Sequence, residues 1–149
     1  MLDLNLPPFD INVKKTAGKL TVFDRLRRKF IALTPEEWVR QHFVNYLIVN
    51  KGYSASLIAN EIQINLHNQK RRCDTVIYDK GLSPIMIVEY KAPEVNITQD
   101  VFDQIVRYNI VLRVKYLVVS NGLNHYCCKL NYETQSFEYL SDIPSYNDL

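Results

Sequence analysis

Two stretches of the chain repeat apolar residues with the spacing of three to four that is typical of amphipathic helices. The first helix is expected from Pro35 to about Val49, with Thr34 as its N-cap and Glu37 completing a capping box. Its expected buried positions are Val39, Phe43, Tyr46 and Leu47. The second helix is expected from near Thr98 to about Leu112. Its expected inward positions are Val101, Ile105, Tyr108 and Leu112.

Elsewhere apolar and polar residues alternate with the period of two that indicates β-strands. Three strands in quick succession, 58–66, 73–78 and 84–91, predict an antiparallel meander, with Ile58, Ile62, Ile64 and Leu66 on one side of the first. After the second helix, a strand at 116–120 and a closing hairpin at 125–130 and 137–140 follow. This order predicts an α/β sandwich.

The length of 149 residues fits one domain. Residues 1–33 are expected to form an extended N-terminal arm that carries a basic knot, Arg25–Lys29. The folded domain is expected over 34–142, and a short acidic tail over 143–149.

Composition excludes several classes of protein. Apolar residues make up 47% and charged residues 23%, which is ordinary globular usage. The longest apolar runs are far shorter than a membrane helix requires, and the first residues lack the pattern of a secretory signal. Three cysteines, two of them adjacent, predict neither a disulfide framework nor a zinc knuckle. We therefore expect a cytoplasmic protein without membrane contact.

The net charge of +2 is small, but its distribution is uneven. Residues 131–149 contain four acidic and no basic residues, so the first 130 residues have a balance of +6. A second basic cluster, Lys70–Arg72, adds to the knot in the arm. Charge runs are most often solvated surface, and that interpretation stands beside one of polyanion binding.

The candidate chemistry lies on the second and third strands of the meander. Glu89 and Lys91 are two apart on a strand and share a face, and the turn could return Glu89 to a position beside Asp74. Adjacent carboxylates repel each other unless a cation lies between them, and their oxygens suit Mg²⁺ or Mn²⁺. Such a cation lowers the pKa of a bound water and neutralises charge on a phosphate, and Lys91 could hold the water or the phosphate.

Glu-x-Lys alone is a weak signal, because it occurs often by chance and usually marks an exposed ion pair of under about 1 kcal/mol. Its position favours a function: it ends the apolar run Ile85–Val88 of an interior strand, where charge is unfavourable without a partner or ligand. On the following helix Gln104 and Tyr108 are four apart, project from one face and could reach a substrate phosphate.

In combination, Cys73-Asp74, Glu89-Tyr90-Lys91 and Gln104-x-x-x-Tyr108 resemble the PD-(D/E)xK nuclease superfamily. Within it the chain resembles the N-terminal nuclease domain of type I restriction enzyme R (HsdR) subunits, which share the Gln-x-x-x-Tyr element. The likeness extends over roughly residues 26–140. It implies a restriction-endonuclease-like three-layer sandwich, with a central mixed β-sheet flanked by helices.

The resemblance also implies roles for individual residues. Asp74 and Glu89 would bind Mg²⁺ or Mn²⁺, and Lys91 would be the catalytic lysine. Gln104 and Tyr108 would support DNA handling and cleavage, and the DNA-contacting set would also include Lys70, Arg71 and Arg72. A further metal-binding acid on the first helix would be Glu37 or Glu36, with Glu61 a weaker candidate. DNA, other subunits of a restriction or repair system and a second copy in a homodimer are the implied partners.

The chain departs from the family in two places. Cys73 stands where the motif has proline, a change commonly tolerated. A phosphate-binding Gly-x-x-x-x-Gly-Lys-Ser/Thr motif is missing, so we expect no ATP-driven translocation by this polypeptide. Beside a Mg²⁺-dependent nuclease, two alternatives stay open: a DNA-binding module of the same fold without useful activity, and an assembly subunit whose acidic tail is an interaction surface.

Overall fold

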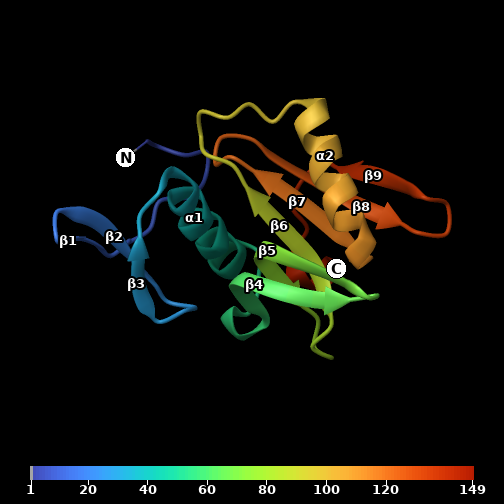
Figure 1. Cartoon of the computed structure of the whole chain (residues 1–149), viewed down its shortest axis with the longest axis horizontal. Helices are drawn as coiled ribbons and strands as arrows, with labels where there is room; N and C mark the ends of the chain where they lie inside the picture. Colours follow the sequence, from blue (N-terminus) through green and yellow to red (C-terminus); the bar gives the residue numbers. More distant parts are fainter. Residues whose placement is uncertain (1) are drawn as a thin grey trace.

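The computed structural model describes residues 2–149 and combines a six-stranded mixed sheet with two α-helices and a separate three-stranded sheet (Figure 1). The helices are α1 (Pro35–Asn50) and α2 (Gln99–Asn109), and α2 runs into a 3₁₀ turn at Ile110–Leu112. The large sheet contains β4 (Ile58–Leu66), β5 (Gln69–Tyr78), β6 (Pro84–Tyr90), β7 (Tyr116–Ser120), β8 (His125–Asn131) and β9 (Ser136–Leu140). The small sheet contains β1 (Val13–Thr16), β2 (Lys19–Asp24) and β3 (Lys29–Ala32).

The strands of the large sheet follow chain order from β4 to β9, and every neighbouring pair is antiparallel except β6 and β7. That one parallel pair results from the crossover through α2, which returns the chain to the edge where β6 began. The predicted meander and closing hairpin are confirmed. β5 begins earlier than expected, at Gln69, so the basic cluster Lys70–Arg72 lies on the strand itself.

The two helices cover opposite faces of the sheet, which confirms the predicted three-layer sandwich. α1 packs Val39, Phe43 and Leu47 into one apolar cluster with the sheet, and Tyr46 lies at its margin. α2 packs Phe102, Val106 and Leu112 into a second cluster on the other face.

The predicted inward face of this helix is only partly right: Leu112 is buried and Ile105 packs against the α2-side cluster, but the main buried positions within α2 are displaced by one residue. Phe102 and Val106 are buried, whereas Tyr108 is 50% exposed. Asn109 is also buried because its side-chain amide donates to the carbonyl of Ile105 at 2.9 Å. Because Asn109 is polar, it does not enter the pattern of apolar side chains, and that pattern alone predicts the wrong rotation of α2.

The start of α1 confirms half of the predicted capping box. The hydroxyl oxygen of Thr34 accepts from the backbone N–H of Glu37 at 3.1 Å. The reciprocal bond is absent from the described residues, because the Glu37 carboxylate instead accepts from Arg27, Arg40 and Gln41. These three hydrogen bonds to the Glu37 carboxylate therefore replace the second bond of the capping box.

Strand alternation breaks where β4 and β5 pass Glu61 and Asp74. Glu61 has φ +52° in the middle of β4, and the regular pairing omits it between Asn60 and Ile62. Ile58, before the break, packs on the α1 side, whereas Ile62, Ile64 and Leu66 pack on the α2 side. The expectation that these four residues share one face is therefore wrong, since a strict period of two cannot anticipate such an irregularity.

Residues before α1 form the β1–β3 meander, not the extended arm expected from the sequence. Buried Asp24 anchors it: its carboxylate accepts from two backbone N–H groups, from Arg27 and from Asn60 of β4. At the other end of the chain, Ile143 is buried in the α1-side cluster and Tyr53 donates to the carbonyl of Pro144. The limits 1–33, 34–142 and 143–149 as domain boundaries stay a prediction.

The three cysteines are free and buried. Within residues 2–149 neither helix has the length and apolar character needed to cross a bilayer.

Candidate functional site

A cavity of about 350 Å³ opens between the start of α1, the middle of β5, the end of β6, and α2. Five sequence-predicted site residues line it together: Asp74, Glu89, Lys91, Gln104 and Tyr108. The remaining lining residues are Glu36, Tyr90, Ile105 and Asn109. Residues up to 73 positions apart in the chain, from Glu36 to Asn109, therefore meet in one cavity.

Strand pairing explains why the two carboxylates are neighbours. Thr75 of β5 lies opposite Val88 of β6 in an antiparallel ladder, so Asp74 and Glu89 occupy the next pair of positions. Because of the break at Glu61, Asp74 is not paired regularly with β4. Oδ2 of Asp74 accepts a hydrogen bond from the backbone N–H of Tyr90 at 2.9 Å. Asp74 is thus held beside the end of β6 and keeps 29% of its side chain exposed.

Glu89 is the most perturbed acid of the cavity. The residue as a whole is half-buried, but its Oε1 is fully buried and has no hydrogen-bond partner among the described residues. Burial, the negative charge of Asp74 and hydrogen bonding to that carboxylate raise the pKa of Glu89 to about 9, and the cations Lys91 and Arg40 oppose this only in part. Without a bound cation, Glu89 therefore holds a proton at neutral pH.

Arg40 of α1 is a functional candidate that the sequence analysis missed. Its guanidinium is buried, contacts Glu37 at 2.6 Å and Glu61 at 2.5 Å, and lies 3.7 Å from Oδ1 of Asp74. Burial would lower the pKa of Arg40, but the carboxylates of Glu37, Glu61 and Asp74 raise it overall. Arg40 therefore places a permanent positive charge behind Asp74.

A signal for Arg40 was present in the sequence. Glu37, Arg40 and Gln41 form a polar strip on α1 between the apolar positions Val39 and Phe43. All three polar side chains are buried in the structure. A polar strip flanked by core positions indicates a buried network, because charged groups are seldom buried without partners.

Of the three acids expected as additional ligands, Glu36, Glu37 and Glu61, only Glu36 lines the cavity. Glu37 is not among the lining residues, and both of its carboxylate oxygens accept hydrogen bonds inside the α1 network. Glu61 is likewise occupied, by Arg40 and Arg72. The neighbouring Glu36 is exposed and lines the cavity, so it is the first-helix acid nearest to the proposed chemistry.

Lys91 follows β6 directly, and its backbone N–H donates to the carbonyl of Ser120 at the end of β7 at 2.9 Å. This bond extends the sheet by one residue and fixes the lysine at the cavity floor beside Glu89. The half-buried Lys91 side chain supplies a cation that lowers the pKa of Glu89 against the effect of burial.

The rim of the cavity joins the basic cluster of β5 to α2. The guanidinium of Arg71 lies over the ring of Tyr108 at 4.8 Å, and its Nε donates to the Tyr108 carbonyl at 3.2 Å. Arg72 instead contacts Glu61, and Lys70 is exposed. Of the three basic residues, Arg71 is the one placed directly against a cavity residue.

The donor set of the cavity suits a hard, hydrated cation. No three His, Cys, Asp or Glu side chains within residues 2–149 gather as a ready-made metal site. Mg²⁺ needs only one or two carboxylates, because waters and substrate phosphates supply its remaining ligands. The two carboxyl groups of Asp74 and Glu89 in one cavity, with Oε1 of Glu89 buried and without a partner among the described residues, fit that requirement.

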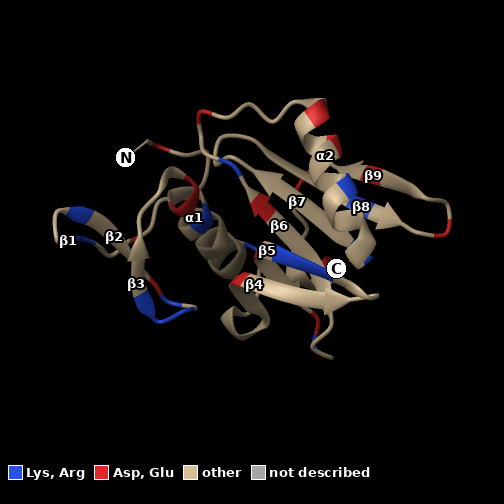
Figure 2. Cartoon of the chain, in the orientation of Figure 1, with Lys and Arg blue, Asp and Glu red and all other residues tan. Residues whose placement is uncertain are grey.

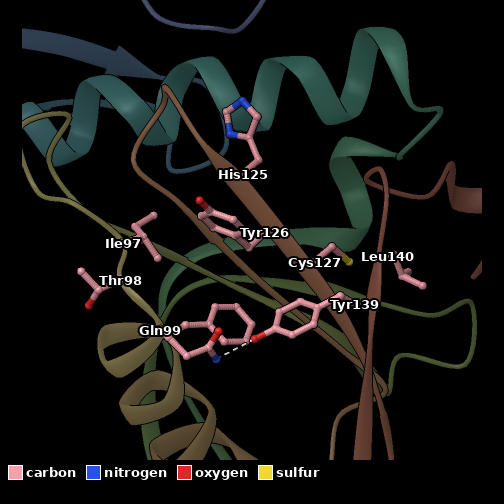
Figure 3. A pocket seen from close by; sticks show the side chains of 9 residues that line it. Ile97, Thr98, Gln99, His125, Tyr126, Cys127, Tyr139 and Leu140 are labelled. Carbon is pink, nitrogen blue, oxygen red and sulfur yellow. Dashed lines mark hydrogen bonds between the residues drawn. The ribbon is translucent and has the colours of Figure 1, made fainter.

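A second cavity, of about 410 Å³, lies between the start of α2 and the β8–β9 hairpin (Figure 3). Tyr126, Tyr139 and Gln99 project toward it, and the Gln99 amide donates to the Tyr139 hydroxyl at 2.9 Å. Its lining residues include no carboxylate, lysine or arginine. It therefore lacks the groups that metal-assisted phosphodiester chemistry requires.

Comparisons with known proteins agree with this geometry. A family model described as the type I restriction enzyme R protein N terminus (HSDR_N) matches residues 35–144. No curated protein matches significantly.

Among solved structures, the chain is similar to a fragment described as an HsdR subunit of a type I restriction enzyme from Vibrio vulnificus YJ016, with 20% identity and a TM-score of 0.55. The likeness covers 80% of this chain and 25% of that one, so the chain spans about a quarter of its length. At this identity the likeness shows the fold alone. Because the family model matches well over half of the 149 residues, the chain belongs to the family of type I restriction enzyme R protein N-terminal domains.

Proposed function

We propose that this domain is a Mg²⁺- or Mn²⁺-dependent nuclease that hydrolyses phosphodiester bonds of DNA. The observation that carries the proposal is the buried, unpartnered Oε1 of Glu89 opposite Asp74, with Lys91 in the same cavity. A buried acid with a strongly raised pKa, next to a second acid and a lysine in a cleft, is typical of a functional site.

Asp74 and Glu89 would hold the cation between them. When bound, such a cation lowers the pKa of a coordinated water and neutralises charge that develops on the phosphate. Because the pKa of Glu89 is raised beside Asp74, binding of the cation would displace a proton from this pair of acids. Arg40 would keep Asp74 oriented, since it approaches Oδ1 while the Tyr90 N–H donates to Oδ2.

Lys91 would bind a phosphate oxygen of the substrate or orient the attacking water, as a point charge at the cavity floor. Gln104 and Tyr108 line the α2 side of the same cavity and could donate hydrogen bonds to the DNA backbone. Arg71, which lies against Tyr108, and the exposed Lys70 next to it on β5 would supply positive charge for neighbouring phosphates.

The family suggests a setting for this activity. We propose that the domain acts in a restriction system together with other subunits, in the cytoplasm. A homodimer would let two such sites cut both strands of a duplex.

The proposal is tested by incubating labelled single- and double-stranded DNA with the wild-type protein and its Lys91→Ala variant, in Mg²⁺ and in Mn²⁺. Lys80→Ala, an exposed lysine in the β5–β6 turn, is the matched control. We expect cleavage by the wild type and the control, and at least a hundredfold loss in the Lys91 variant. Equal cleavage by the Lys91 variant would refute the assigned role. A wild type that cleaves neither DNA would favour the DNA-binding module without activity.

A further inference from the structure

The β1–β3 meander and its flanking residues contain a large excess of basic over acidic residues. Residues 11–33 contain seven Lys or Arg and one acid, Asp24, a balance of +6, so the rest of the chain, given a total of +2, has −4. Figure 2 shows these basic positions spread over the small sheet to one side of α1. Residues 35–144 match the family model, so this meander lies outside the matched part.

Strand pairing assigns the side chains of the meander to two faces. Buried Val22 and Asp24 point toward the rest of the molecule. The alternate residues of β2, Lys19, Thr21 and Phe23, point outward. The residues of β1 and β3 that pair with them point the same way. The outer face consists of Lys14, Thr16, Lys19, Thr21, Phe23, Phe30 and Ala32.

On this outer face a lysine packs against two aromatic rings. The Lys14 ammonium lies 3.9 Å from the centre of the Phe30 ring, and Phe30 packs against Phe23 at 5.3 Å. Lys19 at the start of β2 and Arg28 in the β2–β3 turn are exposed, and neither has an ion-pair partner among the described residues. The single acid of the meander is buried on the opposite face and neutralised by Arg27.

The meander is fixed next to the proposed nuclease site. Arg27, anchored on Asp24, also contacts Glu37 in the first turn of α1 at 3.1 Å. The preceding residue, Glu36, lines the cavity of Asp74 and Glu89. The first turn of α1 therefore connects the meander to the cavity.

We propose that the outer face of the β1–β3 meander is a docking surface for the phosphate backbone of DNA. This inference rests on the proposed function, because it supplies the affinity that the net negative remainder of the chain lacks. DNA carries a dense row of negative charge, and each phosphate contact to Lys or Arg releases condensed counterions. The exposed ring of Phe23 beside the lysines would also tolerate stacking by an unpaired base, so single-stranded DNA is a second source of the same backbone.

The test measures DNA binding without cleavage, in EDTA, by fluorescence anisotropy of a labelled 30-base-pair duplex and of a single strand of equal length. The variant is Lys14→Gln/Lys19→Gln/Arg28→Gln. The control, Lys80→Gln/Lys115→Gln/Lys129→Gln, makes the same change of charge at exposed positions outside the meander. Circular dichroism and thermal unfolding verify that both variants fold.

We expect at least tenfold weaker duplex binding by the meander variant at about 0.1 M salt, and a slope of log Kd against log salt that is lower by about 2–3. The control should stay within about twofold of the wild type. A larger loss on the single strand than on the duplex would identify unpaired DNA as the ligand. Equal effects of the two triple variants, or a wild type without salt-dependent binding, would overturn the proposal.

The two proposals fail in different experiments. If the wild type binds DNA through the meander but never cleaves it in Mg²⁺ or Mn²⁺, the nuclease proposal falls and the docking surface stands. At saturating DNA, the single-turnover cleavage rate of the meander variant should stay within about twofold of the wild type, because none of its three changes touches the cavity.

Discussion

At the scale of single residues, the site depends on a carboxyl group held in an unfavourable place. Glu89 keeps a buried oxygen without a partner beside a second acid, so folding must bring a proton to it or leave a charge poorly hydrated. Core packing alone offers no reason for this arrangement. A bound cation supplies one, since it would replace the proton and satisfy both acids.

The first prediction concerns Glu89→Gln in the metal-free protein. The folded-state pKa of Glu89 is raised, so its contribution to stability is present below about pH 4.5 and is lost as pH rises toward 9. Glutamine needs no proton, so at pH 7.5 the variant should be more stable by about 1–2 kcal/mol, or about 2–6 °C in Tm. Thermal unfolding at pH 5 and pH 7.5 measures this, and the difference should be larger at the higher pH.

Glu133→Gln, at an exposed turn acid, is the control for that measurement and should change Tm by no more than a degree or so. If Glu89→Gln were less stable than the wild type at both pH values, the buried carboxyl group of Glu89 would not be destabilising, and the prediction would be wrong.

The residue scale also shows where sequence reasoning succeeds. Asp74 and Glu89 could be placed side by side from chain distance and strand geometry, because antiparallel neighbours bring fixed positions together. Arg40 could not be identified as easily, since its role depends on three carboxylates from three elements that meet only after folding. Glu37 was misassigned for the same reason.

At the scale of elements, the first turn of α1 joins three parts of the molecule. It receives the N-cap bond from Thr34, the ion pair from Arg27 of the β2–β3 turn, and the Arg40 network that ends at Asp74. The proposed metal site and the β1–β3 meander are therefore mechanically connected through one helical turn.

The second prediction tests the anchor of the meander through Asp24→Asn. Burial alone would raise the pKa of Asp24, but hydrogen bonds from Arg27 and Asn60 lower it overall. The stability that this carboxylate contributes is therefore present at neutral pH and is lost as pH falls below about 4. The variant should lose about 2–3 kcal/mol at pH 7, because Arg27 and Asn60 are left with a weaker acceptor.

Urea unfolding at pH 7 and pH 3 measures this effect, with Asp3→Asn as an exposed control. The gap between wild type and Asp24→Asn should narrow at the lower pH, because the wild-type carboxylate then approaches protonation. A gap that stays constant or widens would contradict the assigned cause.

The elements also show which parts of a fold a hydrophobic pattern can predict. β4 and β7 begin and end at their expected residues, because alternation and apolar runs determine them. The rotation of α2 and the face reversal at Glu61 were missed, since a buried asparagine and a residue with positive φ both violate the simple period. The β1–β3 meander was missed because exposed lysines hide its alternation.

At the scale of the whole molecule, helix order and strand order were enough to predict an α/β sandwich, and the resemblance to the nuclease superfamily implied the three layers that the structure has. The distribution of charge was harder to predict. The part that matches the family model has a net charge close to zero, whereas the meander before it is strongly basic. The molecule thus combines a cleft suited to a cation with a separate surface suited to a polyanion.

The central claim, that Asp74 and Glu89 form a cation site, is tested most directly by calorimetric titration of Mn²⁺ at pH 7.5 in buffers of different ionisation enthalpy. The wild type and Glu133→Gln should bind one ion and release close to one proton, which comes from Glu89. Asp74→Asn should bind at least tenfold more weakly. Binding by Asp74→Asn equal to that of the wild type, or no binding by the wild type, would show that Asp74 and Glu89 do not form a cation site.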